Sequence, residues 1–488
     1  MGSRRRVPPA AARAFVLAGL CYSAWVPLQF LNPGVDRVWA YVSELAAADQ
    51  PWSWLVRAAD VAAGLACLAG VALAPDGRPD RAGTAGWLGL ALFGGMTVLD
   101  AGLFPLDCAS LSDPSCAAAE AAGRVSAAHR IHAVVSSLAL AGVMVSLVAL
   151  PVSALRRRRW RILAWSGAVP ASLMAVATVW TLALVAAGPS GPVGVAQRFQ
   201  LGVVALWLLL LGVALALDRT PEPPPTAHIL AEGAGRPPVL ICAGMAGAWF
   251  HWDRVAAALS RDHEVIRFDR PGLGLSSGHL GPPTLGEEAG RIAALAGTGA
   301  VVVGHSVAGL HAEAFARLHP GQVAGLVLVD PSCESAPRAR AGPCGAAVRA
   351  VQRALPALGR TFGATALAYP VLPLAHRLLM GTSGQGRPVY GRGRVLAAAL
   401  AEWLAYPDMA AELGELRASR PFPRIPVVVL SAGPEDLCHR DLARLLNARL
   451  VTLPGVGHQV QLERPEVIVE AVRTLGGHHD GRPGGRRG

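Results

Sequence analysis

The chain has 488 residues, of which 52% are hydrophobic and 16% charged, and its mean hydropathy is +0.40. An ordinary soluble domain carries roughly 25% charged residues. The composition therefore argues against a purely soluble enzyme, and its apolar content excludes a disordered chain. The net charge is +11, yet the sequence contains no lysine. We interpret this bias toward arginine as codon usage of a GC-rich bacterium and expect no nucleic-acid partner.

The amino-terminal part contains six apolar stretches, each long enough to cross a hydrocarbon core, which takes roughly 20 helical residues. They cover residues 11–31, 54–74, 85–106, 131–152, 162–187 and 195–217. Buried helices of a soluble protein are the alternative, but residues 203–217 have no polar face. A signal peptide before a secreted enzyme would give one such stretch. The sequence therefore predicts an all-α, six-helix transmembrane domain over residues 1–218.

The distribution of arginine predicts the orientation of these spans. Arginines cluster at the N-terminus, in the second loop and in the fourth loop, at positions 4–6, 78, 81 and 156–159. The first and third loops carry few cations and several acidic residues. Positively charged loops stay in the cytoplasm. We therefore expect a multi-pass protein of the inner (plasma) membrane, with both termini and everything after Leu217 in the cytoplasm.

Cysteine placement fits this topology. Cys108 and Cys116 lie in the third loop, on the outer face, where a disulfide could persist; a bridge and two separate thiols are equally open. Four cysteines of the cytoplasmic half are expected to be reduced: Cys242, Cys333, Cys344 and Cys438. None of them forms a CxxC pair, so we expect no structural zinc site. We expect no cofactor, and no metal site in the cytoplasmic half.

The second half alternates short β-branched runs with alanine-rich helical segments after a Pro-rich linker at 219–227. The runs are 239–242, 264–268, 300–303, 324–329, 426–430 and 449–453. Such alternation predicts a mostly parallel sheet with helices on both faces. We expect this α/β domain over residues 228–476, with a helical lid at about 331–421 and a disordered tail at 477–488.

A nucleophile is predicted where the run 300–303 meets a helix. Ser306 stands in the sequence GHSVAG at 304–309, and a serine in a sharp strand-to-helix turn exposes its hydroxyl above the sheet. The usual pattern is G-x-S-x-G; here Ala308 replaces the second glycine, a change that the turn can tolerate. A plain tight turn is the alternative.

A serine of this kind needs a base, an acid and donors for the oxyanion. His458 follows the last run and is the expected base, whereas His305 is expected to be a packing residue. Asp436, in the loop after 426–430, is the preferred acid, with the adjacent Glu435 and the more distant Asp330 as alternatives. The expected oxyanion donors are two backbone N–H groups, those of Met245 and Val307.

With these residues in place, the segment 228–475 resembles the α/β-hydrolase superfamily, in its lidded esterase, lipase and haloperoxidase-like branch. The run FDRPGLGLS at 268–276 matches the family's DRPGxGxS turn, and ERPE at 463–466 matches the helix after the catalytic histidine. There are two departures. Ala243 replaces the family's usual HG histidine, and at most one strand precedes Val239.

The amino-terminal half is similar to a bacterial family of six-helix membrane proteins of unknown function. The resemblance rests on the Ser43-Glu44-Leu45 turn, Asp100 in the third span and the arginine-histidine entry to the fourth. A polar cluster is expected in the outer half of the spans: Asp60, Asp100, His129, His132 and Arg198. Two explanations stay open, namely structural ion pairs (Asp100 with Arg198, Arg57 with Asp60) and a metal or ligand site.

Together these features predict a membrane-tethered serine hydrolase that cleaves an ester through an acyl-enzyme on Ser306. An amide or a thioester is the less favoured substrate. The apolar lid sequence and the tether favour an apolar small-molecule ester that partitions into the lipid bilayer. The alternative is a receptor or transporter-like membrane module whose hydrolase-fold domain binds a ligand without turning it over; fold alone does not decide. The sequence gives no oligomeric state.

Overall fold

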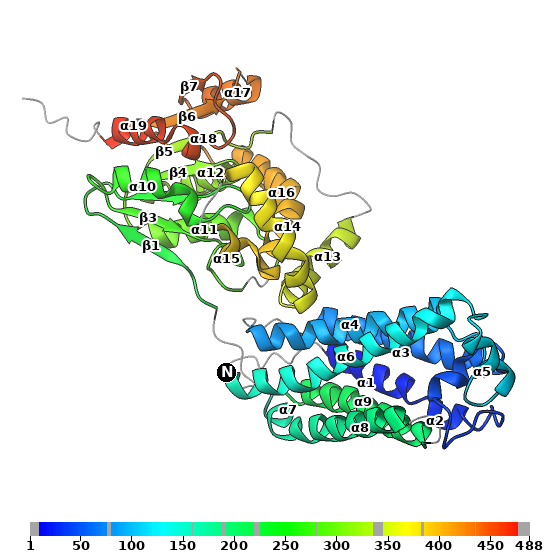
Figure 1. Ribbon diagram of the computed structural model, residues 1–488. Helices are drawn as coiled ribbons and strands as arrows, with labels where there is room; N and C mark the ends of the chain where they lie inside the picture. The colour runs from blue at the N-terminus through cyan, green and yellow to red at the C-terminus, as the bar shows by residue number, and fades with distance from the viewer. Residues whose placement is uncertain are drawn as a thin grey trace, which may run out of the picture. The chain divides into compact units, whose positions relative to one another are not determined.

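The computed structural model describes residues 9–75, 80–158, 160–187, 191–218, 225–278, 281–334, 345–381, 385–434 and 436–476. The chain divides into two compact units near residue 223 (Figure 1). Each unit has its own hydrophobic core. The expected linker at 219–227 lies largely outside the described residues, and the expected tail at 477–488 lies wholly outside them.

The amino-terminal unit is helical, and six of its segments are long and apolar enough to cross a membrane, as predicted. The first combines α1 (Pro9–Tyr22) with α2 (Trp25–Leu28), and the fifth combines α7 (Arg161–Ser166) with α8 (Ala168–Ala187). The others are α3 (Ser53–Leu73), α4 (Arg81–Leu103), α6 (Ala127–Arg157) and α9 (Val193–Ala216). Two short elements, η1 (Val42–Ala46) and α5 (Pro114–Ala121), lie in the first and third connections.

Glycines bring the long helices of this unit close together. A Cβ added to Gly89 would lie 2.5 Å from the carbonyl oxygen of Gly142, and one added to Gly64 would lie 2.6 Å from that of Gly94. Small residues allow such close backbone approach where lipid gives no hydrophobic drive for helix association. The α3–α4 and α4–α6 contacts are therefore fixed by the sequence at these points.

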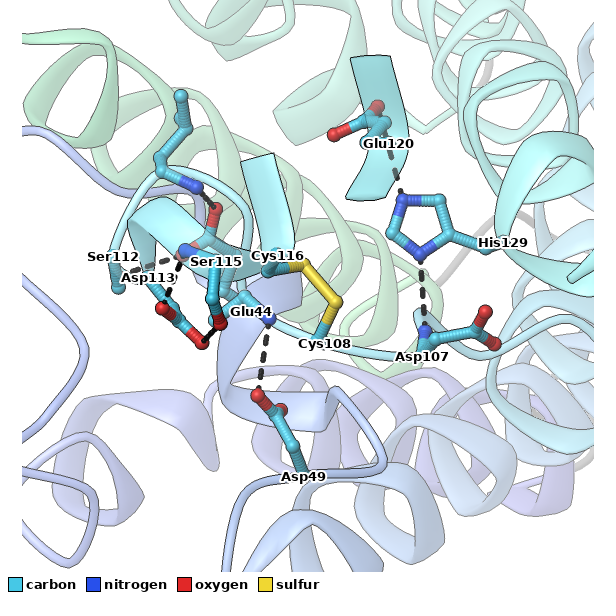
Figure 2. Close-up of a disulfide and its surroundings, with 12 residues drawn as sticks. Glu44, Asp49, Asp107, Cys108, Ser112, Asp113, Ser115, Cys116, Glu120 and His129 are labelled. Carbon is cyan, nitrogen blue, oxygen red and sulfur yellow. Dashed lines mark hydrogen bonds and ion pairs between the residues drawn. A yellow bond between two sulfur atoms is a disulfide. The ribbon is translucent and has the colours of Figure 1, made fainter. Parts of the chain in front are cut away.

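A disulfide joins Cys108 to Cys116 in the third connection, with a Cα–Cα distance of 5.9 Å (Figure 2). The bridge, which the sequence left open, is therefore formed. The buried carboxylate of Glu44, in η1, accepts hydrogen bonds from the N–H of Leu111 and the hydroxyl of Ser112. Burial raises the pKa of this carboxyl. Glu44, in the turn that carries the family resemblance, thus ties the first connection to the third.

The carboxy-terminal unit contains a seven-stranded sheet in the order β1-β3-β2-β4-β5-β6-β7. Its strands are β1 (Ile229–Glu232), β2 (Val239–Cys242), β3 (Val265–Phe268), β4 (Ala300–His305), β5 (Val323–Val329), β6 (Val427–Ala432) and β7 (Arg449–Leu453). Only β1, at the edge, is antiparallel. Valine-rich β4 is buried along its whole length, as a parallel strand covered on both faces should be.

Helices cover both faces of this sheet. One face packs on α11 (Leu285–Ala296), α12 (Ala308–Leu318) and α17 (Leu437–Leu445), and the other on α10 (Asp253–Leu259), α18 (Val460–Glu463) and α19 (Pro465–Gly476). The predicted α/β fold is confirmed. Because parallel strands end at one edge, the loops after β4, β5, β6 and β7 meet there.

The insertion between β5 and β6 is helical, as expected (Figure 1). It contains α13 (Gly345–Leu358), α14 (Phe362–Met380), α15 (Gly386–Tyr390) and α16 (Gly393–Ser419). The sequence analysis expected a helical lid here without locating all of its individual helices.

Candidate active site

Ser306 lies in a strained turn between β4 and α12. Its φ is +54°, which is uncommon for a residue with a side chain, and its N–H donates to the carbonyl of Val329 at 3.1 Å. The turn is tight enough that a Cβ on Gly304 would lie 2.6 Å from the carbonyl oxygen of Ala308. This is the geometry in which a serine hydroxyl is held above the end of a sheet.

The loop after β2 lies directly against this serine. A Cβ added to Gly244 would lie 3.1 Å from the Cβ of Ser306, so glycine is required for the close approach. The N–H groups of Met245 and Val307, the two expected oxyanion donors, donate no hydrogen bond within the described residues. Both donors are therefore free for a substrate oxygen.

A buried ion pair that the sequence analysis missed holds this loop in place. Arg270 donates to Glu402 of α16 through Nε (2.5 Å) and Nη2 (3.0 Å). The same guanidinium donates to the carbonyls of Ala243 and Gly244. Glu402 in turn accepts the N–H of Ala246 at 3.0 Å. Arg270 belongs to the DRPG turn, which was the available signal, but its partner is 132 residues away.

Two more contacts join the helical insertion to the same region. The hydroxyl of Tyr390 donates to the carbonyl of Ala246 at 2.8 Å. The Nε2 atoms of His251 and His376 lie 2.9 Å apart, in a stack that includes the Tyr390 ring. The insertion therefore packs on the loop that carries the oxyanion donors, where a lid would lie.

His458 pairs with Asp330 and not with Asp436. Its Nδ1 lies 2.5 Å from Oδ2 of Asp330, while its Nε2 has no hydrogen-bond partner within the described residues. Burial raises the pKa of the Asp330 carboxyl, but hydrogen bonds from His458 and from the N–H of Ala432 outweigh it and hold the pKa below its usual range. Asp330 is thus ionised at neutral pH and can fix the imidazole's tautomer.

The expectation that Asp436 would be the partner of His458 is wrong in this structure. Asp436 is the N-cap of α17, where its carboxylate accepts the N–H of Cys438 at 2.8 Å. Its side chain is 49% exposed, against 14% for Asp330. The alternative Glu435 lies outside the described residues.

His305, expected to be a packing residue, also forms a hydrogen bond. Its Nε2 donates to the carbonyl oxygen of His458 at 2.9 Å, and the two rings lie 4.7 Å apart. Burial, and then the nearby His458, lower the pKa of His305 to about 4, so its ring is neutral. Because His305 adjoins Ser306 in sequence, this bond fixes the loop of the predicted base next to the predicted nucleophile.

Comparison with known proteins identifies the families of the two domains. Residues 239–471 match the alpha/beta hydrolase family, and residues 15–214 match a family described as protein of unknown function (DUF998). The chain joins a DUF998 domain to an α/β-hydrolase domain. Both resemblances stated from the sequence are thereby confirmed.

Individual relatives match the hydrolase domain only. The protein named "Putative carbamate hydrolase RutD" of Azorhizobium caulinodans is 33% identical over 103 residues, which are 20% of this chain and 38% of that protein. An enol-lactonase from Burkholderia xenovorans LB400 is 25% identical, covers 51% of this chain and 96% of its own, and has a TM-score of 0.38. A deformylase from Pseudomonas putida S16 is 22% identical, covers 51% of this chain and 96% of its own, and has a TM-score of 0.38.

Three buried histidines of the hydrolase domain give a prediction for stability. Burial lowers the pKa of His251 to about 3, of His305 to about 4 and of His311 to about 3. As the pH falls, these histidines are therefore protonated first in the unfolded chain, near their ordinary pKa of about 6.5, and only at lower pH in the folded one. Stability should fall as the pH drops from about 6.5 toward 4, by about 1.4 kcal/mol per pH unit for each histidine. Urea unfolding of the domain at successive pH values measures this slope.

The matched variant for this prediction is His311→Leu. The buried Nε2 of His311 has no partner within the described residues, so its loss removes a proton site and no hydrogen bond. The slope should become shallower by about one third of its size. An unchanged slope would contradict the assignment of buried neutral histidines.

A second disulfide joins Cys333 to Cys438 in the hydrolase domain, with a Cα–Cα distance of 6.0 Å. The expectation that both are reduced thiols is therefore wrong for this structure. The reason is spatial: Cys333 follows the Asp330 loop after β5, and Cys438 lies at the start of α17 after the neighbouring strand β6. Cys242 is a free buried thiol, and Cys344 lies outside the described residues.

This bond should contribute measurably to stability because it spans 105 residues. Loss of a disulfide that closes so long a loop typically costs about 2–4 kcal/mol. Cys333→Ser is expected to lower the free energy of unfolding of the hydrolase domain by that amount and to make it insensitive to dithiothreitol. The Cys108–Cys116 bridge is present in both proteins and does not affect the comparison. Equal free energies of unfolding for wild type and Cys333→Ser, measured without reductant, would contradict the Cys333–Cys438 pairing.

The expected polar cluster of the DUF998 domain separates into three groups. Asp100 pairs with Nδ1 of His132 at 2.9 Å. His129 instead accepts the N–H of Asp107 and lies 3.8 Å from Glu120 (Figure 2). Arg198 donates to backbone carbonyls and to a glutamine. Neither expected ion pair, Asp100 with Arg198 or Arg57 with Asp60, forms among the described residues.

Proposed function

We propose that the chain is a membrane-tethered serine hydrolase that cleaves an ester through an acyl-enzyme on Ser306. The observation that carries this proposal is the coincidence at one sheet edge of a strained serine, a paired histidine and two free N–H donors. A domain that only bound ligands would have no need of a nucleophile, a base and an acid together. That argument favours the enzyme over the receptor-like alternative.

The proposed reaction has two steps, acylation and deacylation of Ser306, and each group acts once in each step. Ser306 Oγ attacks the acyl carbon while Nε2 of His458 takes its proton, and Asp330 stabilises the imidazolium that forms. The N–H groups of Met245 and Val307 donate to the developing oxyanion. The imidazolium then protonates the leaving alcohol, which departs. Water repeats the sequence on the acyl-enzyme, releases the acid and returns the proton to Ser306.

An apolar acyl group is the proposed substrate class. In the helical insertion, α14 exposes large apolar side chains: Leu367 (61%), Val371 (52%), Leu374 (58%) and Leu378 (75%). Exposed apolar surface of this kind marks a contact with apolar ligands or lipid. A substrate that partitions into the bilayer would reach a tethered enzyme at raised local concentration.

The proposed location is the inner membrane, with the hydrolase domain in the cytoplasm. The support is the arginine content of the N-terminus and of the even-numbered loops. A reporter fused after Thr220 should then behave as cytoplasmic, and Cys108 should react with an impermeant thiol reagent after reduction. Periplasmic behaviour at Thr220 would reverse the compartment. In the cytoplasm the Cys333–Cys438 bond would be exposed to reducing thiols.

The proposal is tested with the purified full-length protein and p-nitrophenyl esters of short and long acyl chains. We expect a burst of nitrophenol equal to the enzyme concentration, followed by a slower steady rate, because an activated ester acylates Ser306 faster than water removes the acyl group. Matched amide, thioester and carbamate substrates define the bond class; the carbamate is included because of the similarity to RutD. No turnover of any of the four classes would contradict the proposal.

A further inference from the structure

The DUF998 domain contains a cavity of about 260 Å³ whose lining comes from each of its six apolar segments. An engineered cavity of roughly 150 Å³ already admits a benzene molecule, so this one has room for a small organic ligand. Its walls carry carboxylates, hydroxyls, amides and aromatic rings. The lining is mainly apolar, so its two carboxylates stand out as charged groups among apolar neighbours.

Asp60 of α3 faces this cavity without a partner of its own. It forms no hydrogen bond and no ion pair within the described part of the chain. The nearby cation that could have neutralised it, Arg57, donates instead to the carbonyl of Ala101 at 2.8 Å. An ionisable side chain inside a membrane-spanning bundle is costly, and such residues usually serve a function.

The charge of the lining has one sign. Asp100 supplies a second carboxylate, held by the hydroxyl of Ser136 at 3.1 Å and by His132. His132 is not part of the lining, and none of the lining residues is an arginine, lysine or histidine. Arg198, on α9, donates to the carbonyls of Ala40 and Gly194. Two carboxylates therefore meet at a cavity whose own wall supplies no cation.

Aromatic rings and unused polar groups complete the wall. Tyr22, Trp25, Tyr41 and Phe93 contribute rings, and a cation is attracted to the face of such a ring. The indole N–H of Trp25 is buried and has no hydrogen-bond partner in the described structure. A buried donor without a partner costs free energy, and an acceptor beside the ammonium group, such as the hydroxyl of ethanolammonium, would satisfy it.

These observations distinguish among cations. Within the described residues, no group of three or more histidine, cysteine or acidic side chains is placed to hold a metal ion. An ammonium group needs only acceptors for its N–H groups and tolerates aromatic neighbours. We propose that the cavity of the DUF998 domain binds a small organic ammonium ion, with Asp60 as its principal counter-charge. The proposal does not depend on the hydrolase activity.

The ammonium could belong to a soluble amine or to a phosphatidylethanolamine headgroup. The first arm of the test measures binding of phenethylammonium and ethanolammonium to the full-length protein in detergent, by calorimetry. Their neutral counterparts, 2-phenylethanol and ethylene glycol, are the matched ligands. The second arm compares thermal unfolding in nanodiscs of phosphatidylethanolamine and of phosphatidylglycerol.

We expect saturable binding or stabilisation by the ammonium form in at least one arm, and at least tenfold weaker binding of the neutral counterparts. Asp60→Asn should weaken ammonium binding at least tenfold and leave hydrolysis of a soluble ester unchanged. Asp49→Asn, which alters an exposed acid outside the lining, is the matched control and should bind as wild type. Response to the soluble amines identifies a free ligand, and response to the lipid alone identifies a headgroup.

Leu201→Trp provides an independent variant because it fills the cavity without touching a carboxylate. It should abolish binding even if Asp60→Asn proves unstable. Equal binding of ammonium and neutral ligands, full binding by both variants, or no response in either arm would overturn the proposal.

Discussion

Ser306→Ala is expected to reduce ester hydrolysis by roughly ten-thousandfold to a millionfold, the range seen when a triad nucleophile is removed. The hydroxyl is the only protein group in the proposed reaction that bonds to the acyl carbon, so no neighbouring side chain replaces it. Folding should be retained, because the structural role of Ser306 lies in its backbone: its N–H bonds to Val329. Initial rates with a short p-nitrophenyl ester, and the melting temperature, measure the two effects.

The matched control is Ser332→Ala. Ser332 lies beside the site, and its backbone N–H donates to the carbonyl of Ser306 at 2.9 Å, a bond that alanine keeps. Activity within about twofold of wild type is expected. If both serine variants retained activity, hydrolysis would not proceed through Ser306.

Asp330→Asn is expected to reduce kcat by about ten-thousandfold, as loss of the triad acid does when it leaves the imidazole in the wrong tautomer. Asp436→Asn should remain near wild type, because asparagine is as good an N-cap as aspartate and keeps the bond to the Cys438 N–H. The comparison uses the same change at two acids, so general effects of neutralisation cancel. The reverse order of effects would restore Asp436 as the acid.

The misassignment of the acid has a physical origin. Acidic residues follow both β5 and β6, and these strands are neighbours: the N–H of Asp330 donates to the carbonyl of Leu430. Both loops therefore open at the same sheet edge, and sequence order does not say which carboxylate reaches His458. The sequence analysis preferred the later loop, whereas the pairing depends on how far each side chain reaches, which only the coordinates give.

The sequence predicted the spans, six of the seven strands, Ser306 and His458 from local signals. It did not place β1, whose residues are mostly exposed and lack a clear period, and it expected the lid without locating α14, which contains Pro370 and Pro373. Pairings over long separations were also missed, such as Arg270 with Glu402. In the spans, ion pairs of Arg57 and Arg198 with carboxylates were one explanation left open, but both arginines donate to backbone carbonyls. A backbone carbonyl is present at every residue, so residue types alone do not reveal such an acceptor.

The central claim is that Ser306 is the nucleophile of an enzyme, and covalent labelling tests it most directly. Full-length protein in its membrane is treated with a fluorophosphonate, digested and analysed by mass spectrometry. We expect one phosphonylated peptide, modified at Ser306 (within GHSVAG at 304–309). Labelling should be lost in Ser306→Ala and slowed strongly in His458→Ala. An unlabelled wild-type protein, or a label on another residue that persists in Ser306→Ala, would contradict the claim.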